Sequence, residues 1–493
     1  MTSRVHPRPE SPAKESNPSR NVHSIDSYSI QKLLELDDYT QQTSLRRVVF
    51  VLAMTPLPGL VGALLPTFIP LDNISTTPTA SFAAHVMVMQ VVVNFGAILP
   101  ALVTTQIPRD AYSLREVAAV SLISAVMTTG SIFGIATVWR YPIPFQMVST
   151  IPMWSLTYAG AHVVVLRSKL WRHPALRRGI QLYGPPFIVQ VCQAGLYPGF
   201  SVLFDRSSTT IKILLTVCFP FVKYAMKKSL HRISHGLLDY SGEVAVSGVE
   251  ICASLYQSIL MQTTSSAAAM ATIMGLDVLM GILAIKLLMD KKTHVPRNEL
   301  VSRAVRLLRS ELKTSSSHGN GSTLNQSFET RQPEFALRTD SKATQDERLV
   351  IRQALEFANA AEAVLLVEYF EVMIPVANCI FLAVAAHLPS ARFNTRLAPF
   401  YYSPHTLGEA VISTLLYSSL QGLSCVVMHF VMKYRYGLSA AYHLSFVMER
   451  HLLSIQGKLL AWLSVILHFS VIHYGADFTF RFKYDYRPLR PDT

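Results

Sequence analysis

Long apolar runs recur along almost the whole of this sequence, and they constrain its fold more than any other feature. An α-helix rises about 1.5 Å per residue, so about 20 apolar residues cross the roughly 30 Å of hydrocarbon in a bilayer. Half of the 493 residues are hydrophobic and only 15% are charged, whereas a soluble domain carries about 25% charged residues. The runs therefore predict an all-α fold, a polytopic integral membrane bundle with about eleven transmembrane helices.

The eleven predicted spans are not equally strong. In 209–226, Lys212 and Lys223 leave only a short apolar core, and the count also depends on how residues 438–455 are divided. If 209–226 does not cross the membrane, every later segment runs the other way. The predicted spans are 48–71, 83–107, 117–139, 143–166, 184–204, 209–226, 242–262, 266–288, 362–388, 407–432 and 453–474.

The basic residues predict the orientation, because Lys and Arg are enriched in cytoplasmic loops. With the N-terminus inside, the inner segments carry 32 of the 44 Lys and Arg residues and the outer segments carry 8. The sequence thus places the N-terminus in the cytoplasm and the C-terminus on the outer or lumenal side. It does not distinguish the plasma membrane from an endomembrane.

The net charge of +13 arises from short basic clusters between the apolar runs. This pattern indicates contact with anionic inner-leaflet lipids, and we expect the lipid bilayer and no nucleic acid as partner. The sequence contains no Walker loop, no GxGxxG after a strand, and no HExxH or GxSxG motif. We therefore expect no cofactor and no metal, and an enzyme ranks third among the functional hypotheses.

The segments outside the spans divide the chain into five parts. Apolar positions on one face of 298–312 predict an amphipathic helix lying along the inner headgroups, followed by a disordered linker. The parts are a disordered polar tail (1–46), about eight spans (47–289), a cytoplasmic loop (290–350), about three spans (351–475) and an aromatic, basic tail at the outer interface (476–493).

Polar residues inside two consecutive spans form the first candidate site. Glu243, Glu250 and Gln257 stand seven residues apart, so they share one helical face. The next span follows after a very short turn, which predicts an antiparallel hairpin. Equal depths would then bring Glu250 opposite Asp277, where the two carboxylates share a proton, and Glu243 close to Lys286.

A second cluster lies on a later span. Glu368, Glu371 and Asn378 occupy one helical face together with Pro375, which frees a backbone carbonyl beside them. Such a bent helix with nearby carboxylates is typical of ion sites in transporters.

Two functions remain open from these residues. Acids at bilayer depth are costly and often mark an ion pathway, which favours an ion-coupled or proton-coupled transporter or channel. The same acids can instead join helices by hydrogen bonds in a receptor or scaffold that does not transport. Asn73, in the sequence Asn-Ile-Ser of the first outer loop, is a possible glycosylation site. The glycine pairs in GSIFG (130–134) and GLYPG (195–199) predict close helix packing.

Five short segments resemble an uncharacterised family of multi-pass membrane proteins expanded in oomycetes. They are AMTPLPGL (53–60), VEICASLYQSILMQ (249–262), VLLVEYFEVMIP (364–375), ERHLLSIQGKLLAWL (449–463) and HYGADFTFRF (473–482). They are scattered over most of the predicted membrane domain. The family has no established activity, so the resemblance implies a shared architecture and adds no catalytic or binding residue.

Overall fold

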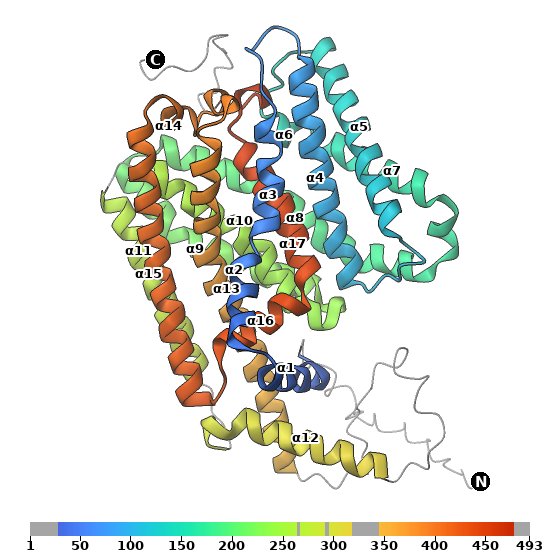
Figure 1. Ribbon diagram of the computed structural model, residues 1–493, viewed down its shortest axis with the longest axis vertical. Helices are drawn as coiled ribbons and strands as arrows, with labels where there is room; N and C mark the ends of the chain where they lie inside the picture. The colour runs from blue at the N-terminus through green and yellow to red at the C-terminus, as the bar shows by residue number, and fades with distance from the viewer. Residues whose placement is uncertain (1–27, 264–266, 291–294, 318–344, 478–493) are drawn as a thin grey trace, which may run out of the picture.

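The computed structural model describes residues 28–263, 267–290, 295–317 and 345–477, and within these ranges it forms helices and no β-strand (Figure 1). The α-helices are α1 (Ile30–Gln42), α2 (Leu45–Met54), α3 (Leu57–Leu64), α4 (Ala80–Thr104), α5 (Leu114–Val138), α6 (Gln146–Ser149), α7 (Ile151–Arg172), α8 (Pro174–Arg206), α9 (Thr209–Ile233), α10 (Ser241–Thr263), α11 (Ala267–Met289), α12 (Leu300–Ser317), α13 (Gln345–Ala385), α14 (Ala398–Tyr402), α15 (Pro404–Tyr436), α16 (Ala440–Arg450) and α17 (Leu452–His468). Short 3₁₀ helices are η2 (Pro66–Phe68), η3 (His235–Tyr240), η4 (Arg297–Glu299), η5 (Pro389–Phe393) and η6 (Ile472–Tyr474).

Nine helical segments of the described residues are long and apolar enough to cross a membrane, which agrees with the predicted helical multi-pass architecture. The weak segment 209–226 lies in one of them, because α9 continues to Ile233. The nine are Leu45–Phe68, Ala80–Thr104, Leu114–Val138, Pro174–Phe204, Thr209–Ile233, His235–Gln262, Met270–Met289, Gln345–Ala385 and His405–Tyr436.

Two predicted spans do not meet this criterion, so the structure does not support the count of eleven. Residues 143–166 include a loop and α6 before α7 begins, and the helical geometry of α7 breaks at Arg167. Residues 453–474 contain α17, which ends at His468 after 17 residues. Both segments still pack within the bundle, and whether they cross the membrane stays a prediction.

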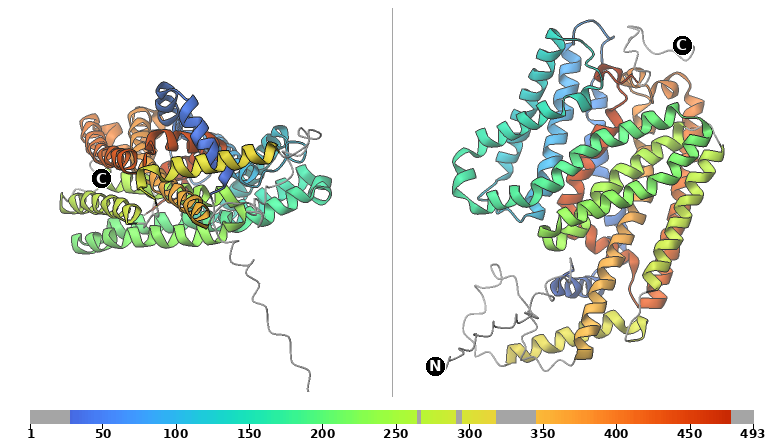
Figure 2. Two further views of the ribbon diagram at one scale, coloured as in Figure 1. Left: turned by 90° about the horizontal axis from the view of Figure 1, so that it is seen from below. Right: turned by 180° about the vertical axis from the view of Figure 1, so that it is seen from behind.

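The outer faces of the bundle carry large apolar side chains that are open to the surroundings. On α9, α11 and α15, for example, Phe221 is 71% exposed, Leu279 58% and Ile412 68%. Such a surface is costly in water and is favourable against lipid chains. At the back of the bundle, α8 and α9 lie side by side (Figure 2).

The centre of the bundle is formed by α10 and α17. The apolar part of the segment His235–Gln262, which contains α10, is completely buried. Helix α10 contacts α8, α9, α13, α15 and α17. Glycines let α17 approach α4 closely: a Cβ atom added to Gly457 would lie 2.5 Å from the Gly96 carbonyl oxygen. By contrast, no described residue lies within 4 Å of a Cβ added at Gly130 or Gly134.

The close helix contacts predicted for GSIFG and GLYPG are thus wrong. Among the described residues, a Cβ at Gly199 would also meet nothing within 4 Å, and one at Gly195 would make an ordinary contact at 3.7 Å. The spacing of small residues identifies where helices are able to approach closely, but the partner helix decides whether they do.

The tail predicted to be disordered (1–46) contains an ordered helix, so the prediction of disorder is wrong for its last part. Residues 30–42 form α1, whose N-terminus is capped by the Ser29 side chain. Its residues Leu33 and Leu36 are buried in the main hydrophobic core. The polar composition of 1–46 concealed this short amphipathic helix. Residues 1–27 lie outside the described residues.

The amphipathic helix predicted at 298–312 occurs as α12, but its apolar face packs on protein. Leu300, Ala304, Val305 and Leu308 are buried in the core that includes residues of α1 and α13. Its apolar face is therefore not free to lie on lipid headgroups. The predicted linker up to residue 344 and the aromatic tail from residue 478 lie outside the described residues.

The described chain begins and ends at opposite ends of the bundle (Figure 1). At one end lie α1, α12 and α16; at the other, Gly475 accepts a hydrogen bond from the backbone N–H of Phe145 just before α6. Asn73 is exposed in the loop between η2 and α4. Which end faces the cytoplasm stays a prediction.

Candidate functional site

A network of acids and lysines lies in the middle of the bundle, where α9, α10 and α13 meet. Lys223 bridges two carboxylates: its Nζ lies 2.7 Å from Glu250 Oε2 and 2.8 Å from Glu371 Oε1. Lys227, one helical turn further along α9, places its Nζ 2.7 Å from Glu250 Oε1. Lys223, Glu250 and Glu371 are all buried. The structure thus brings these two predicted acids together, with a lysine between them.

Asp277 of α11 has polar neutral partners instead of a lysine. Its Oδ2 accepts hydrogen bonds from the Tyr417 hydroxyl at 2.7 Å, from Gln421 Nε2 at 3.1 Å and from Gln257 Nε2. Among the described residues, Asp277 makes no ion pair with Lys or Arg. It borders a small cavity of about 20 Å³, which is enough for about one water molecule.

Glu368 is the second acid without a basic partner in the described part of the chain. Its side chain lies against α11, because a Cβ atom added at Gly281 would be 3.4 Å from Glu368 Oε1. The residue is only 2% exposed, and its Oε2 atom has no hydrogen-bond partner among the described residues. Glu368 stands three residues before Glu371 on α13, next to the Lys223 bridge.

Glu243 belongs to a separate ion pair between α10 and α17. Its Oε1 lies 2.8 Å from Lys458 Nζ and accepts a hydrogen bond from Ser247 at 2.7 Å. The Ser454 hydroxyl donates to Oε2 at 3.0 Å. Glu243 and Lys458 are both almost completely buried.

The predicted pairs Glu250–Asp277 and Glu243–Lys286 are therefore wrong. Glu250 is held by two lysines, Glu243 by Lys458, and Lys286 is exposed on α11. The reason is the course of the chain: the main neighbours of α11 are α9, α13 and α15, and α10 is not among them. Depth matching assumed that consecutive helices pack side by side. A hydrogen bond between Gln257 and Asp277 joins polar side chains of the two helices.

Asn378 does not belong to the ionic network. Its Nδ2 donates to the Ser258 hydroxyl at 2.8 Å, so it connects α13 to α10. The helix containing Pro375 runs without interruption from Gln345 to Ala385, so α13 is not a discontinuous helix of the kind that binds ions in transporters.

The three lysine partners were missed as site residues, although the sequence contains a signal for them. Lys223 and Lys458 lie within predicted spans, and Lys227 follows one of these spans directly. A lysine at bilayer depth is costly unless it is paired, so each intramembrane lysine should have been matched with an acid. Tyr417 and Gln421, which bind Asp277, carry no such signal.

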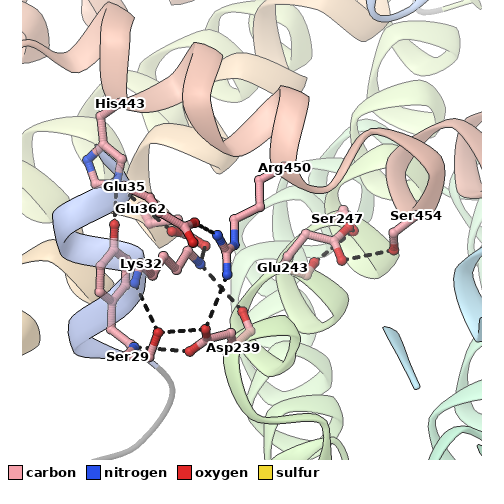
Figure 3. Close-up of polar contacts among 11 residues, drawn as sticks. Ser29, Lys32, Glu35, Asp239, Glu243, Ser247, Glu362, His443, Arg450 and Ser454 are labelled. Atoms are coloured by element: carbon pink, nitrogen blue, oxygen red, sulfur yellow. Dashed lines mark hydrogen bonds and ion pairs between the residues drawn. The ribbon is translucent and has the colours of Figure 1, made fainter. Parts of the chain in front are cut away.

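A third polar cluster fixes α1 to one end of the bundle (Figure 3). Lys32, which is completely buried, lies 2.8 Å from Glu362 Oε1 of α13. The Ser29 backbone N–H and hydroxyl donate to the two Asp239 carboxylate oxygens at 3.0 and 2.8 Å. Arg450 of α16 forms an ion pair with Glu35 and lies 3.6 Å from Asp239.

Figure 3 shows the Glu243 carboxylate, with Ser247 and Ser454, beside this cluster. His451 lies between α16 and α17 and contacts the Tyr240 ring edge to face, with centroids 4.8 Å apart. Burial, followed by the nearby Lys32 charge, lowers the pKa of His451 to about 4. The imidazole is therefore neutral at pH 7.

Within the described residues, no group of three or more His, Cys, Asp or Glu side chains is arranged to hold a metal ion. His85 and His468 form an edge-to-face pair, with ring centroids 5.3 Å apart. Comparison of the chain with protein-family models, curated proteins and solved structures found no match. The resemblance to the oomycete family therefore stays a prediction.

Proposed function

We propose that this protein is a proton-coupled or cation-coupled membrane transporter or channel, with Asp277 and Glu368 as its ion-binding groups. The observation that carries the proposal is an imbalance of charge at mid-bundle. Glu250 and Glu371 have lysine partners, whereas Asp277 and Glu368 have none among the described residues. Two lysines thus stand against four carboxylates.

This imbalance matters because of the surroundings. A charged side chain at the bilayer centre costs about 3 kcal/mol on insertion scales. Negative charges on both Asp277 and Glu368, beside Glu371, are disfavoured by mutual repulsion as well. Asp277 and Glu368 therefore need a proton or a bound cation, which is the property that a coupled transporter uses.

Lys223 is placed to couple the two groups to helix movement. It already contacts Glu371, one turn from Glu368 on α13. If Glu368 or Asp277 releases its proton, the new negative charge attracts Lys223 away from Glu250. Because Lys223 lies on α9, that exchange of partners would change how α9 packs against α10 and α13.

The test is proton flux into liposomes that contain the purified protein. A potassium diffusion potential, negative inside, drives protons inward, and a trapped pH-sensitive dye reports their entry. We expect flux with the wild-type chain, and a loss of at least about tenfold in the double variant Asp277→Asn, Glu368→Gln, because neither group then exchanges a proton. Equal flux in both proteins would refute the proposed role.

A matched control uses an acid outside the network. Glu356 is on the same helix as Glu368, but its side chain is 47% exposed and pairs with Arg352. Glu356→Gln should leave the flux unchanged. Gel filtration in detergent checks that each variant remains monodisperse, so that a loss of flux cannot be attributed to misfolding.

A receptor or scaffold without transport is the second candidate, and the pairing of most buried acids with lysines favours it. Glu243, Glu250 and Glu371 all have buried lysine partners, and the cavity at Asp277 holds about one water. In this case the basic inner loops would bind anionic lipid or cytosolic partners. Wild-type protein that carries no flux but co-floats with anionic liposomes, and less with neutral ones, would support it.

A further inference from the structure

A larger cavity lies away from the ionic network, between α4, α5, α6, α7, α8 and α17. Its volume is about 120 Å³, similar to the roughly 150 Å³ apolar cavity that holds a benzene ring in an engineered protein. None of the residues that line it is exposed, and the cavity is partly open to the surroundings. The cavity therefore has the size of one ring.

Aromatic side chains form much of its wall. Trp154 and Phe187 face it from α7 and α8, with ring centroids 6.0 Å apart, and Trp462 faces it from α17. Tyr183 and Tyr474 complete this part of the wall. Flat apolar walls of this kind stack well on a planar or nearly planar ring.

Three glutamines give the cavity unused hydrogen-bonding capacity. Gln146 is only 1% exposed, and its Oε1 has no partner among the described residues. Gln90 Oε1 and Gln190 Nε2 likewise lack a partner in the described part of the chain, and all three residues line the cavity. A buried polar atom without a partner costs about 1–3 kcal/mol, which a hydroxyl group in the cavity would recover.

One wall of the cavity is held firmly. Gly96 and Gly457, at the crossing of α4 and α17, are packed backbone to backbone, and Gly96 itself lines the cavity. Lys458, which also lines it, is fixed by its ion pair with Glu243. This wall is therefore formed before a ligand arrives, which reduces the ordering cost of binding.

We propose that this cavity binds the hydroxyl-bearing ring of a neutral molecule, with the ring against Trp154 and Trp462 and the hydroxyl on Gln146. A hydroxyl group both donates and accepts, so it satisfies an amide oxygen and an amide N–H together. The source of the ring is either a small phenol or the hydroxylated ring of a sterol from the bilayer. This proposal does not depend on proton-coupled transport.

Tryptophan fluorescence provides the test, because two of the four tryptophans line the cavity. The other two, Trp139 and Trp171, are 65% and 80% exposed, and replacing both by Phe removes their signal. In this background, titration with 4-ethylphenol should change the emission in a saturable way. A change that grows linearly with concentration would show partition into detergent and would overturn the proposal.

Filling the cavity supplies the first comparison. Ala97→Leu on α4 places a larger side chain in it, whereas Ala84→Leu makes the same change at an exposed position of the same helix. Ala97→Leu should weaken 4-ethylphenol binding at least tenfold and Ala84→Leu should not. Val191→Phe fills the cavity from α8 and serves if Ala97→Leu does not fold. Equal affinities in filled and control variants would overturn the proposal.

The hydroxyl contact has its own comparison. Gln146→Met keeps the length of the side chain and removes its amide. It should weaken the binding of 4-ethylphenol about tenfold, which corresponds to the loss of one good hydrogen bond, and leave the binding of ethylbenzene unchanged. Equal weakening of both probes would rule out the Gln146 contact. Competition by a soluble sterol would identify a bilayer source, and saturable phenol binding without such competition would identify small phenols.

Discussion

Lys458 of α17 lies 2.8 Å from Glu243 of α10, and this buried ion pair joins the two helices at the centre of the bundle. The two residues are 215 positions apart in the sequence. Two serines complete the hydrogen bonds of the carboxylate, so the charges are paired and solvated by the protein itself.

Replacing one residue of this ion pair should destabilise the protein more than replacing both. Glu243→Met or Lys458→Met alone leaves an uncompensated buried charge, and we expect each to lower the free energy of unfolding by about 3–5 kcal/mol. The double variant should be more stable than either single variant. Unfolding by SDS in mixed micelles, followed by circular dichroism, measures all four proteins. Additive losses in the double variant would contradict this prediction.

The crossing of α4 and α17 should not tolerate a methyl group. In Gly457→Ala the new Cβ would lie 2.5 Å from both the Gly96 carbonyl oxygen and the Pro100 ring, so the helices must separate. We expect a loss of roughly 1–3 kcal/mol in the free energy of unfolding, as for overpacking in general. Gly134→Ala is the control, because its Cβ would lie more than 4 Å from every described neighbour and alanine favours helix by about 1 kcal/mol. Similar effects at both glycines would be evidence against this packing.

The buried His451 should make stability depend on pH. Its pKa in the folded protein is about 4, against about 6.5 in an unfolded chain. Between these values the unfolded state binds more protons, so stability falls as the pH is lowered from 7. At pH 5 this one group should account for a loss of about 2 kcal/mol.

His451→Asn should therefore lose less stability than the wild type between pH 7 and pH 5. The comparison residue is His387, which is exposed at the end of the bundle that α13 reaches at its C-terminus. His387→Asn should follow the wild-type curve. Thermal unfolding in detergent at the two pH values gives one difference in stability for each of the three proteins. Equal differences for His451→Asn and wild type would argue against a buried neutral imidazole.

Labelling from the two sides of the membrane tests the predicted orientation. Ser302 of α12 and Asn73 in the loop before α4 are both exposed and lie at opposite ends of the described bundle (Figure 1). In a background without native cysteines, Ser302→Cys should react only after the membrane is opened to a reagent that cannot cross it. Asn73→Cys should react from outside intact cells or from the lumen of an endomembrane. Reversed accessibility would show that the α12 end faces outward.

The candidate site was only partly predictable, and the missing part was the partner of each acid. The period of seven placed Glu243 and Glu250 on one face, and both are buried in the structure. Depth alone then suggested Lys286 and Asp277 as their partners, because a short turn usually joins neighbouring helices. A second helix, α9, supplies the lysines of Glu250 instead. Sequence position does not contain that information.

What the sequence by itself determined was the helical class: runs of apolar residues must satisfy their backbone polar groups as helices, so nine of the eleven predicted segments follow from local composition. Only the tertiary structure decided which helices touch, where Gly96 meets Gly457, and that α1 is bound through Lys32 and Glu362. It also created the cavity beside Trp154 and Trp462. The physical reason is that helix formation depends on residues a few positions apart, whereas ion pairs, close contacts and cavities depend on side chains that hundreds of residues separate.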